Sequence, residues 1–280
     1  MELNIALPDN LFVSYTSEGV PPPEARGHSK TAALKAYLKR DAPLLRLRER
    51  LKTVGWGFVA SAYKDLDWVK KTRAIIKPVR IAPSKPVRKM PSFLIRPTWS
   101  NVRKRPGEII IVLDPGMAFG TGSHFTTKSC LGALLDLVAG KLVISANASL
   151  LDVGSGTGII AIAAKKLKVK RVVGIDIDPV AVDTSGANAA RNRVKISISK
   201  TPVEMVKGAF TIVAANILAD ALKKLAPVIA AKTAKHGFLI LSGILVEQAK
   251  EVSAVYERFG FKPFKNYSDN EWTTLLMVRR

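Results

Sequence analysis

The sequence predicts an α/β protein in which a small N-terminal α/β module precedes a doubly wound, mostly parallel seven-stranded sheet. From residue 108 onward, short apolar runs alternate with segments of helical periodicity, a pattern typical of parallel β-α-β units. The chain has 280 residues, of which 48% are hydrophobic, so it is long and apolar enough for one large domain beside a smaller one. A proline-rich stretch separates the two parts.

Residues 1–75 are expected to form the small module. Their pattern predicts a strand at 2–7 and, after a proline cluster at 21–23, two helices at 29–40 and 44–53. The mixture of one strand and two helices indicates a compact α/β unit.

Residues 76–107 are expected to be a proline-rich linker. Prolines at 78, 83, 86, 91, 97 and 106 prevent a long helix and favour a stiff, extended connector. A short strand is predicted inside this linker, at 92–96.

Residues 108–280 are expected to form the large domain. Its predicted strands are 109–113, 149–153, 171–175, 196–199, 211–215, 238–242, 262–267 and 272–278. Its predicted helices are 126–139, 158–168, 179–192, 220–234 and 245–259. Turn residues at 268–270 separate the last two strands, which are therefore expected to pair as a hairpin.

A glycine-rich turn follows the strand 149–153 and indicates a nucleoside site. Gly154, Gly156 and Gly158 allow positive φ and let a ligand approach the backbone. Asp176 ends the next strand, where a carboxylate accepts hydrogen bonds from the hydroxyls of a ribose. The alternative is a tight turn with no ligand.

The spacing of the glycines favours S-adenosylmethionine over NAD. The dinucleotide pattern places its third glycine one residue later than Gly158. Asp152, just before the turn, disfavours a phosphate and can orient the ammonium of S-adenosylmethionine through backbone or water; alternatively it caps the next helix. Asp178, before Pro179, is expected to be a structural helix cap.

The formal net charge of +22 is concentrated at the N-terminus. Residues 1–110 hold 22 Lys and Arg against 9 Asp and Glu. Such an excess attracts polyanions, so RNA or a ribonucleoprotein particle is a candidate neighbour. The alternative is a solvated lysine-rich surface that reflects the general composition of the host.

The number of cysteines and the hydropathy of the sequence indicate the cellular compartment in which the protein works. The one cysteine, Cys130, excludes an internal disulfide and a cysteine-cluster metal site, and we expect no bound metal. The N-terminus lacks the pattern of a signal peptide, and no apolar stretch is long enough to span a bilayer. We expect a cytoplasmic protein that makes no contact with membranes.

Three stretches resemble the PrmA-type methyltransferases, which modify large-subunit ribosomal protein eleven. The longest is Asp114-Pro-Gly-Met-Ala-Phe-Gly-Thr-Gly-Ser-His-Phe-Thr-Thr127. The other two are Val213-Ala-Ala-Asn-Ile-Leu-Ala219 and Leu241-Ser-Gly-Ile-Leu-Val-Glu-Gln-Ala249, and Asn270-Glu-Trp272 fits the family's last hairpin. The resemblance covers residues 106–280, with a fainter echo at Asp67-Trp68.

The resemblance implies the class I S-adenosylmethionine-dependent methyltransferase fold and methylation of amino groups, on lysine side chains or an N-terminal amine, of a ribosomal protein. It further implies that the N-terminal module recognises the substrate. Thr127, Gly154, Asp176 and Asn216 match the family's cofactor-contacting positions, and Asn216 would also orient the substrate amine. Its amide offers both donors and an acceptor, although an asparagine here could instead cap the following helix.

Two further residues belong to the long motif. Its glycines form a flexible loop, on which Phe119 can close over the cofactor and exclude water. His124 is a candidate general base, but no carboxylate partner is evident in the sequence, and the simpler interpretation is a histidine that fixes the turn.

Methyl transfer to an amine is an in-line displacement, which needs alignment and a dry site. The lysine must be neutral, yet at pH 7 fewer than about one in a thousand is. Lowering its pKa by about three units corresponds to roughly 4 kcal/mol. Burial beside a sulfonium acts in that direction.

Other functions stay open at this point. Methylation of another protein or of RNA keeps the enzyme class, although an RNA amino-group enzyme would usually carry Asn-Pro-Pro-aromatic where this chain has Asn216-Ile-Leu-Ala219. A ribosome-binding factor could keep the fold without turnover. An NAD-dependent reductase would require the displaced third glycine.

Overall fold

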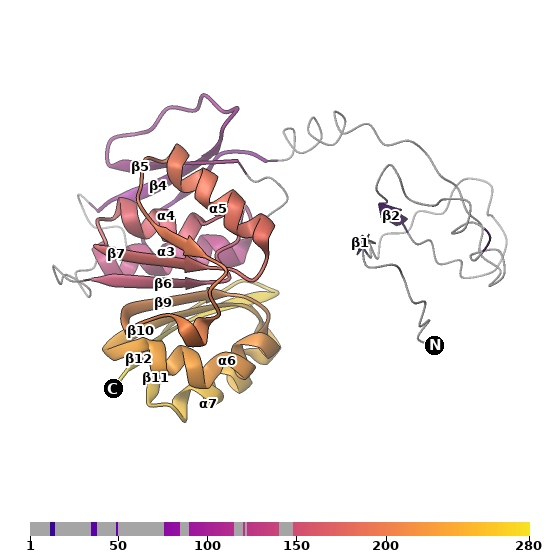
Figure 1. Ribbon diagram of the computed structural model, residues 1–280. Helices are drawn as coiled ribbons and strands as arrows, with labels where there is room; N and C mark the ends of the chain where they lie inside the picture. The colour runs from indigo at the N-terminus through magenta and orange to yellow at the C-terminus, as the bar shows by residue number, and fades with distance from the viewer. Residues whose placement is uncertain are drawn as a thin grey trace. The chain divides into compact units, whose positions relative to one another are not determined.

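The computed structural model describes residues 12–14, 35–37, 49, 76–84, 90–114, 120, 122–139 and 148–280 (Figure 1). The chain divides into two compact units, residues 1–65 and 66–280. Within the described part of the chain, no helix is both long and apolar enough to cross a membrane.

In the first unit, strand β1 (Phe12–Ser14) pairs antiparallel with β2 (Lys35–Tyr37). The helix predicted at 29–40 is therefore wrong at 35–37, because pairing with a strand more than twenty residues away overrides local helix propensity. The predicted strand at 2–7 and the segment Asp67-Trp68 lie outside the described residues. Of the predicted helix at 44–53, only Glu49 is described, and it is helical.

The second unit contains the predicted seven-stranded sheet, in the order β11-β12-β10-β9-β6-β7-β8. Its strands are β6 (Ser149–Val153), β7 (Arg171–Ile175), β8 (Ser197–Ser199), β9 (Phe210–Asn216), β10 (Thr233–Leu245), β11 (Phe261–Ser268) and β12 (Trp272–Arg279). Pairs among β6 to β10 are parallel, whereas β12 pairs antiparallel with β10 and β11, as the predicted hairpin requires. The chain leaves β6 for β7 and β8 on one side, then returns to β9 and β10 on the other.

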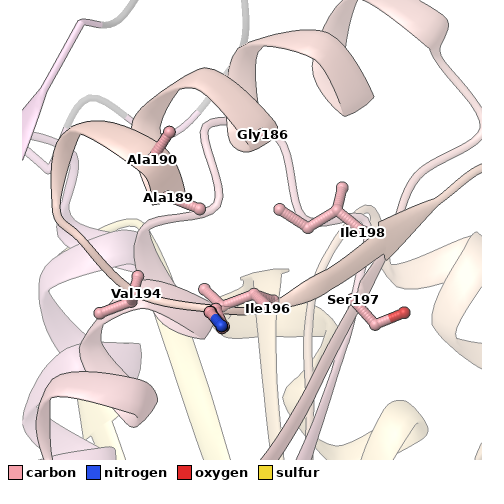
Figure 2. A pocket seen from close by; sticks show the side chains of 8 residues that line it. Gly186, Ala189, Ala190, Val194, Ile196, Ser197 and Ile198 are labelled. Carbon is pink, nitrogen blue, oxygen red and sulfur yellow. The ribbon is translucent and has the colours of Figure 1, made fainter.

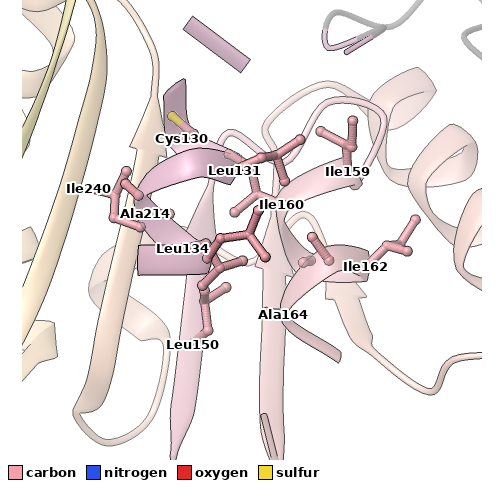
Figure 3. Packing of buried hydrophobic residues seen from close by; sticks show 14 of the residues in the cluster. Cys130, Leu131, Leu134, Leu150, Ile159, Ile160, Ile162, Ala164, Ala214 and Ile240 are labelled. Atoms are coloured by element: carbon pink, nitrogen blue, oxygen red, sulfur yellow. The ribbon is translucent and has the colours of Figure 1, made fainter. Parts of the chain in front are cut away.

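Helices cover both faces of this sheet. They are α3 (Phe125–Ala139), α4 (Ile159–Lys166), α5 (Pro179–Arg191), α6 (Ala219–Lys232) and α7 (Ala249–Glu257), with short 3-10 turns η1 (Val203–Met205) and η2 (Val246–Gln248). One apolar core joins α3 and α4 to the sheet (Figure 3), and a second joins α6 and α7 to it. The doubly wound fold is confirmed.

Element boundaries differ most around β10. This strand begins at Thr233, directly after α6, and runs past the predicted end at 242 as far as Leu245. The helix predicted at 245–259 is consequently shorter, because its first residues extend the strand and form η2.

A separate three-stranded sheet precedes α3. Its strands are β3 (Val79–Ile81), β4 (Ser92–Pro97) and β5 (Glu108–Leu113), and β4 pairs antiparallel with β3 and parallel with β5. The strand predicted at 92–96 is confirmed. Residues 76–107 contain two strands, β3 and β4, which pair with each other, and Phe93 of β4 is buried in the first core.

The strand predicted at 109–113 forms, as β5, but it does not join the large sheet. Side-chain amides of α5 and the residue after it occupy its other edge: Asn192 Oδ1 accepts from Val112 N–H at 2.9 Å, and Asn192 Nδ2 donates to Val112 O at 2.6 Å. Asn188 binds Asp114 N–H and C=O in the same way, at 2.9 and 3.1 Å. These two asparagines complete the edge pairing that a neighbouring strand would otherwise supply.

Candidate active site

The candidate site lies at the carboxyl ends of β6, β7, β9 and β10. In open parallel sheets, ligands bind at this edge, where strand order reverses. Here the reversal occurs at β6, which has β7 on one side and β9 on the other. The glycine turn, Asp176 and Asn216 each follow or end one of these strands.

All three glycines of the turn adopt positive φ, with +74° at Gly154, +53° at Gly156 and +77° at Gly158. Most side chains would be strained there, as the sequence predicted. The turn is tied to β7 because Gly154 N–H and Ser155 N–H both donate to Ile175 O, at 2.9 and 3.0 Å. A side chain at Gly154 would also collide with Ile217, since its Cβ would lie 2.6 Å from the Ile217 Cγ2 atom.

The carboxylate of Asp176 is fixed by two backbone donors. Gly156 N–H donates to Oδ2 at 2.8 Å, and Asp178 N–H donates to Oδ1 at 3.0 Å. Each carboxylate oxygen can accept a further hydrogen bond. Asp178 itself caps α5, since its Oδ1 accepts from Val180 N–H at 2.8 Å, which confirms the structural role predicted for it.

Asp152 is buried beneath the turn, with 1% of its surface exposed. Its Oδ2 accepts from Ala161 N–H at 3.1 Å, in the first turn of α4, whereas Oδ1 has no hydrogen-bond partner among the described residues. Burial raises the pKa of this carboxyl to about 7; the Ala161 hydrogen bond opposes the rise, and the nearby Asp176 charge adds to it. Asp152 thus anchors α4 to the turn, and its charge changes near neutral pH.

Two further predicted residues, Thr127 and Asn216, come from the first and second family motifs, and the start of α3 meets the end of β9 through Thr126 and Asn216. Thr127 is fully buried in α3, and its hydroxyl has no hydrogen-bond partner among the described residues. Asn216 ends β9 and is partly exposed. Phe119 lies outside the described residues.

Comparison with known proteins identifies the family. The family described as Ribosomal protein L11 methyltransferase (PrmA) matches residues 12–280. The Ribosomal protein L11 methyltransferase of Geobacter metallireducens is 40% identical over 261 residues, which are 91% of this chain and 78% of that protein. The same-named protein of Methylobacillus flagellatus is 37% identical over 283 residues, covering 100% of this chain and 89% of its own.

This chain belongs to the ribosomal protein L11 methyltransferase family. The crystal structure of a ribosomal protein L11 methylase from Lactobacillus delbrueckii subsp. bulgaricus supports this assignment: it superposes with a TM-score of 0.61 and 29% identity, over 72% of this chain and 98% of that one. The fold is that of class I S-adenosylmethionine-dependent methyltransferases, and the protein is an enzyme of this type. The reductase alternative is thereby excluded.

The site fits the cofactor of this family. Bare glycine backbone and a fixed carboxylate suit an adenosine. The buried Thr127 Oγ1, Asp152 Oδ1 and Ser155 Oγ atoms have no hydrogen-bond partner among the described residues. Since an unpaired buried polar group costs about 1–3 kcal/mol, a polar ligand beside them would relieve that cost. Ile177, next to Asp176, is 90% exposed, and the sequence reasoning did not single it out.

The residues around Asn216 contain the main feature that the sequence did not predict. Asn216 Nδ2 lies 3.4 Å from Thr126 Oγ1, which lies 2.8 Å from His124 Nδ1. The carbonyl of Thr126 accepts from Ser129 and Ser242, whose hydroxyls both contact Thr274. The long motif contributes His124 and Thr126, and the two other stretches contribute Asn216 and Ser242, which was the available signal. His124 accepts from Thr126 N–H at 3.3 Å in the turn before α3. A carboxylate that the sequence did not reveal lies near its ring: the Trp272 N–H chiefly lowers the pKa of Asp269, and the nearby His124 adds to the lowering.

A hollow of about 600 Å³ lies elsewhere, between the end of α5 and the edge strand β8 (Figure 2). Its lining includes Ala189, Val194, Ile196 and Ile198. None of the predicted site residues lines it, so it is not the methyltransferase site.

Proposed function

We propose that this enzyme methylates amino groups of ribosomal protein L11, on lysine side chains or an N-terminal amine. The proposal is carried by the position of Asn216, whose amide ends β9 beside the glycine turn in a chain of this family. The relatives named above carry L11 in their names.

The cofactor, when bound, supplies a methyl group on a positively charged sulfur. The chain contributes binding and alignment. We assign cofactor contact to Gly154, Gly156, Gly158, Asp152 and Asp176. Thr127, Asn216 and Phe119 complete the set. Asn216 in addition holds the substrate amine in line with the methyl group, and we assign the burial that keeps this amine neutral to the site as a whole.

Charges at the carboxyl edge support a basic substrate. The acidic residues that follow the strands of the large sheet there are Asp176, Asp178, Asp220, Glu247, Asp269 and Glu271. Lys223 pairs with Asp220 at 3.0 Å, and Lys200 follows β8 at the same edge, so the carboxylates outnumber the basic groups without standing alone. Exposed basic residues at the opposite, amino edge include Lys168, Lys170, Arg171, Lys207 and Lys235. A negative rim around the site attracts a basic protein despite the overall charge of +22, because the nearest charges dominate the local potential.

We further propose that residues 1–75 recognise the substrate protein and contact ribosomal RNA through their positive charge, that 76–107 connects them to the methyltransferase domain at 108–280, and that the protein acts in the cytoplasm. A composition bias of the host remains the competing explanation of the charge. Salt dependence of binding to ribosomal RNA distinguishes the two, since neutralised phosphates give a steep slope.

The experiment is incubation of the purified enzyme with methyl-labelled S-adenosylmethionine and a hypomethylated ribosomal fraction of the host. Protein and RNA are then separated, and the labelled species is identified by mass spectrometry. We expect label on L11. Label on RNA or on another protein would overturn the substrate assignment, and cofactor binding without any label would favour a non-catalytic ribosome-binding role.

A further inference from the structure

The hydrogen bonds of Thr126 show which group donates and which accepts in its contact with His124. Thr126 N–H donates to His124 Nδ1, which must therefore present a lone pair. The Thr126 hydroxyl lies 2.8 Å from the same nitrogen. Because an unprotonated ring nitrogen only accepts, the hydroxyl is the donor in this contact.

The same donor-to-acceptor order determines how Thr126 contacts Asn216. With its hydrogen committed to His124, Thr126 Oγ1 offers lone pairs to its other neighbour, so it accepts from an Asn216 Nδ2–H at 3.4 Å. The planar amide then turns Oδ1 away from Thr126. The orientation of this amide is thus set by the His124 ring through the Thr126 hydroxyl.

Buried contacts fix Thr126 itself. Its carbonyl accepts from Ser129 Oγ at 3.0 Å and from Ser242 Oγ at 3.4 Å. Thr274 Oγ1 lies 2.6 Å from both of these hydroxyls, and all four residues are at most 6% exposed. The Trp272 ring meets the His124 ring edge to face, with centroids 5.3 Å apart.

We propose that Thr126 and His124 are positioning residues that hold Asn216 Oδ1 toward the substrate amine; this inference rests on the proposed function. A neutral amine has N–H donors and one lone pair. Oδ1 accepts an N–H and leaves that lone pair free to form the N–C bond, while the S–C pair returns to sulfur and the new ammonium loses its proton to solvent. A reversed amide would donate to the lone pair and block the attack.

The test compares Thr126→Val, which removes the hydroxyl at equal size, with Thr126→Ser, which keeps it. We expect Thr126→Val to lower kcat about 10- to 100-fold with cofactor Kd changed less than about threefold, because misplaced reactants lose rate rather than cofactor affinity. Thr126→Ser should recover most of the rate. The matched control is Thr211→Val, which removes a hydroxyl that bonds Ser149 at the amino edge of the sheet.

Loss of kcat no larger than in Thr211→Val, or no recovery in Thr126→Ser, would overturn the proposal. A readout independent of activity is the ¹⁵N chemical shift of the His124 ring nitrogens, assigned with His124→Asn among the three histidines of the chain. We expect an unprotonated Nδ1 in the native protein. A protonated Nδ1 would overturn the proposed positioning of Asn216 by Thr126 and His124, even if L11 is methylated. If instead the shifts agree and L11 is not labelled, the substrate assignment fails and the orientation of Asn216 stands.

Discussion

The folded protein should lose stability as pH rises because Asp152 is buried, and replacing Asp152 by asparagine should remove this contribution to the loss. Burial raises the pKa of Asp152 from 3.8 to about 7 in the folded protein. Between these values the unfolded chain has released the proton and the folded chain keeps it, so the free energy of unfolding falls as pH rises. Three pKa units correspond to about 4 kcal/mol. The asparagine side chain carries no charge and its amide oxygen can still accept from Ala161 N–H, so the variant escapes this loss.

The measurement is urea unfolding of wild type and Asp152→Asn from pH 4 to pH 8 without cofactor. We expect the free energy of unfolding of the variant to increase relative to that of wild type as pH rises, by about 4 kcal/mol in total. The difference should level off above pH 7. Asp183→Asn, at an exposed position on α5, is the control and should show no such trend. A stability difference that is constant with pH would refute the argument, because it would mean that the buried carboxyl titrates normally.

Three further predictions concern other parts of the molecule. Asp176→Ala should weaken S-adenosylmethionine binding roughly 10- to 150-fold, the equivalent of about 1.5–3 kcal/mol for hydrogen bonds to a charged group, as measured by calorimetry. Gly243→Ala should lower the free energy of unfolding by about 2–5 kcal/mol, since φ is +80° and the new Cβ would lie 2.4 Å from Ile217 O. Deleting residues 1–75 should leave cofactor binding intact and abolish methylation of the intact substrate protein.

Each of these has an outcome that contradicts it. If Asp176→Ala leaves the affinity for S-adenosylmethionine unchanged, Asp176 does not bind the ribose and the proposed position of the ribose is wrong. Gly186→Ala is the control for Gly243→Ala, because nothing lies near its added Cβ and a helical alanine should stabilise by about 1 kcal/mol; equal effects would remove the steric argument. If the deletion variant keeps full activity on the native substrate, the N-terminal region does not recognise that substrate.

Much of the large domain could be predicted because its information is local. A run of apolar residues, a glycine turn and a helical period lie within about twenty residues of one another, and Asp176 follows from the same β-α-β unit. The failures involve partners that are distant in the chain. A strand, β2, forms where a helix was predicted, because it pairs with β1. The strand β5 pairs with β4 instead of joining the large sheet, and Asn188 and Asn192, 74 and 80 residues away, bind its other edge.

The sequence by itself determined the doubly wound fold, the glycine turn and the family, since each depends on residue types at fixed short spacings. The tertiary structure alone decided how the site is held. Thr126 meets Asn216 90 residues away and Ser242 116 residues away, and Ser129 meets Thr274 at a separation of 145. Hydrogen bonds depend on atoms within about 3.5 Å, and only the folding of the chain brings these four separate segments within that distance.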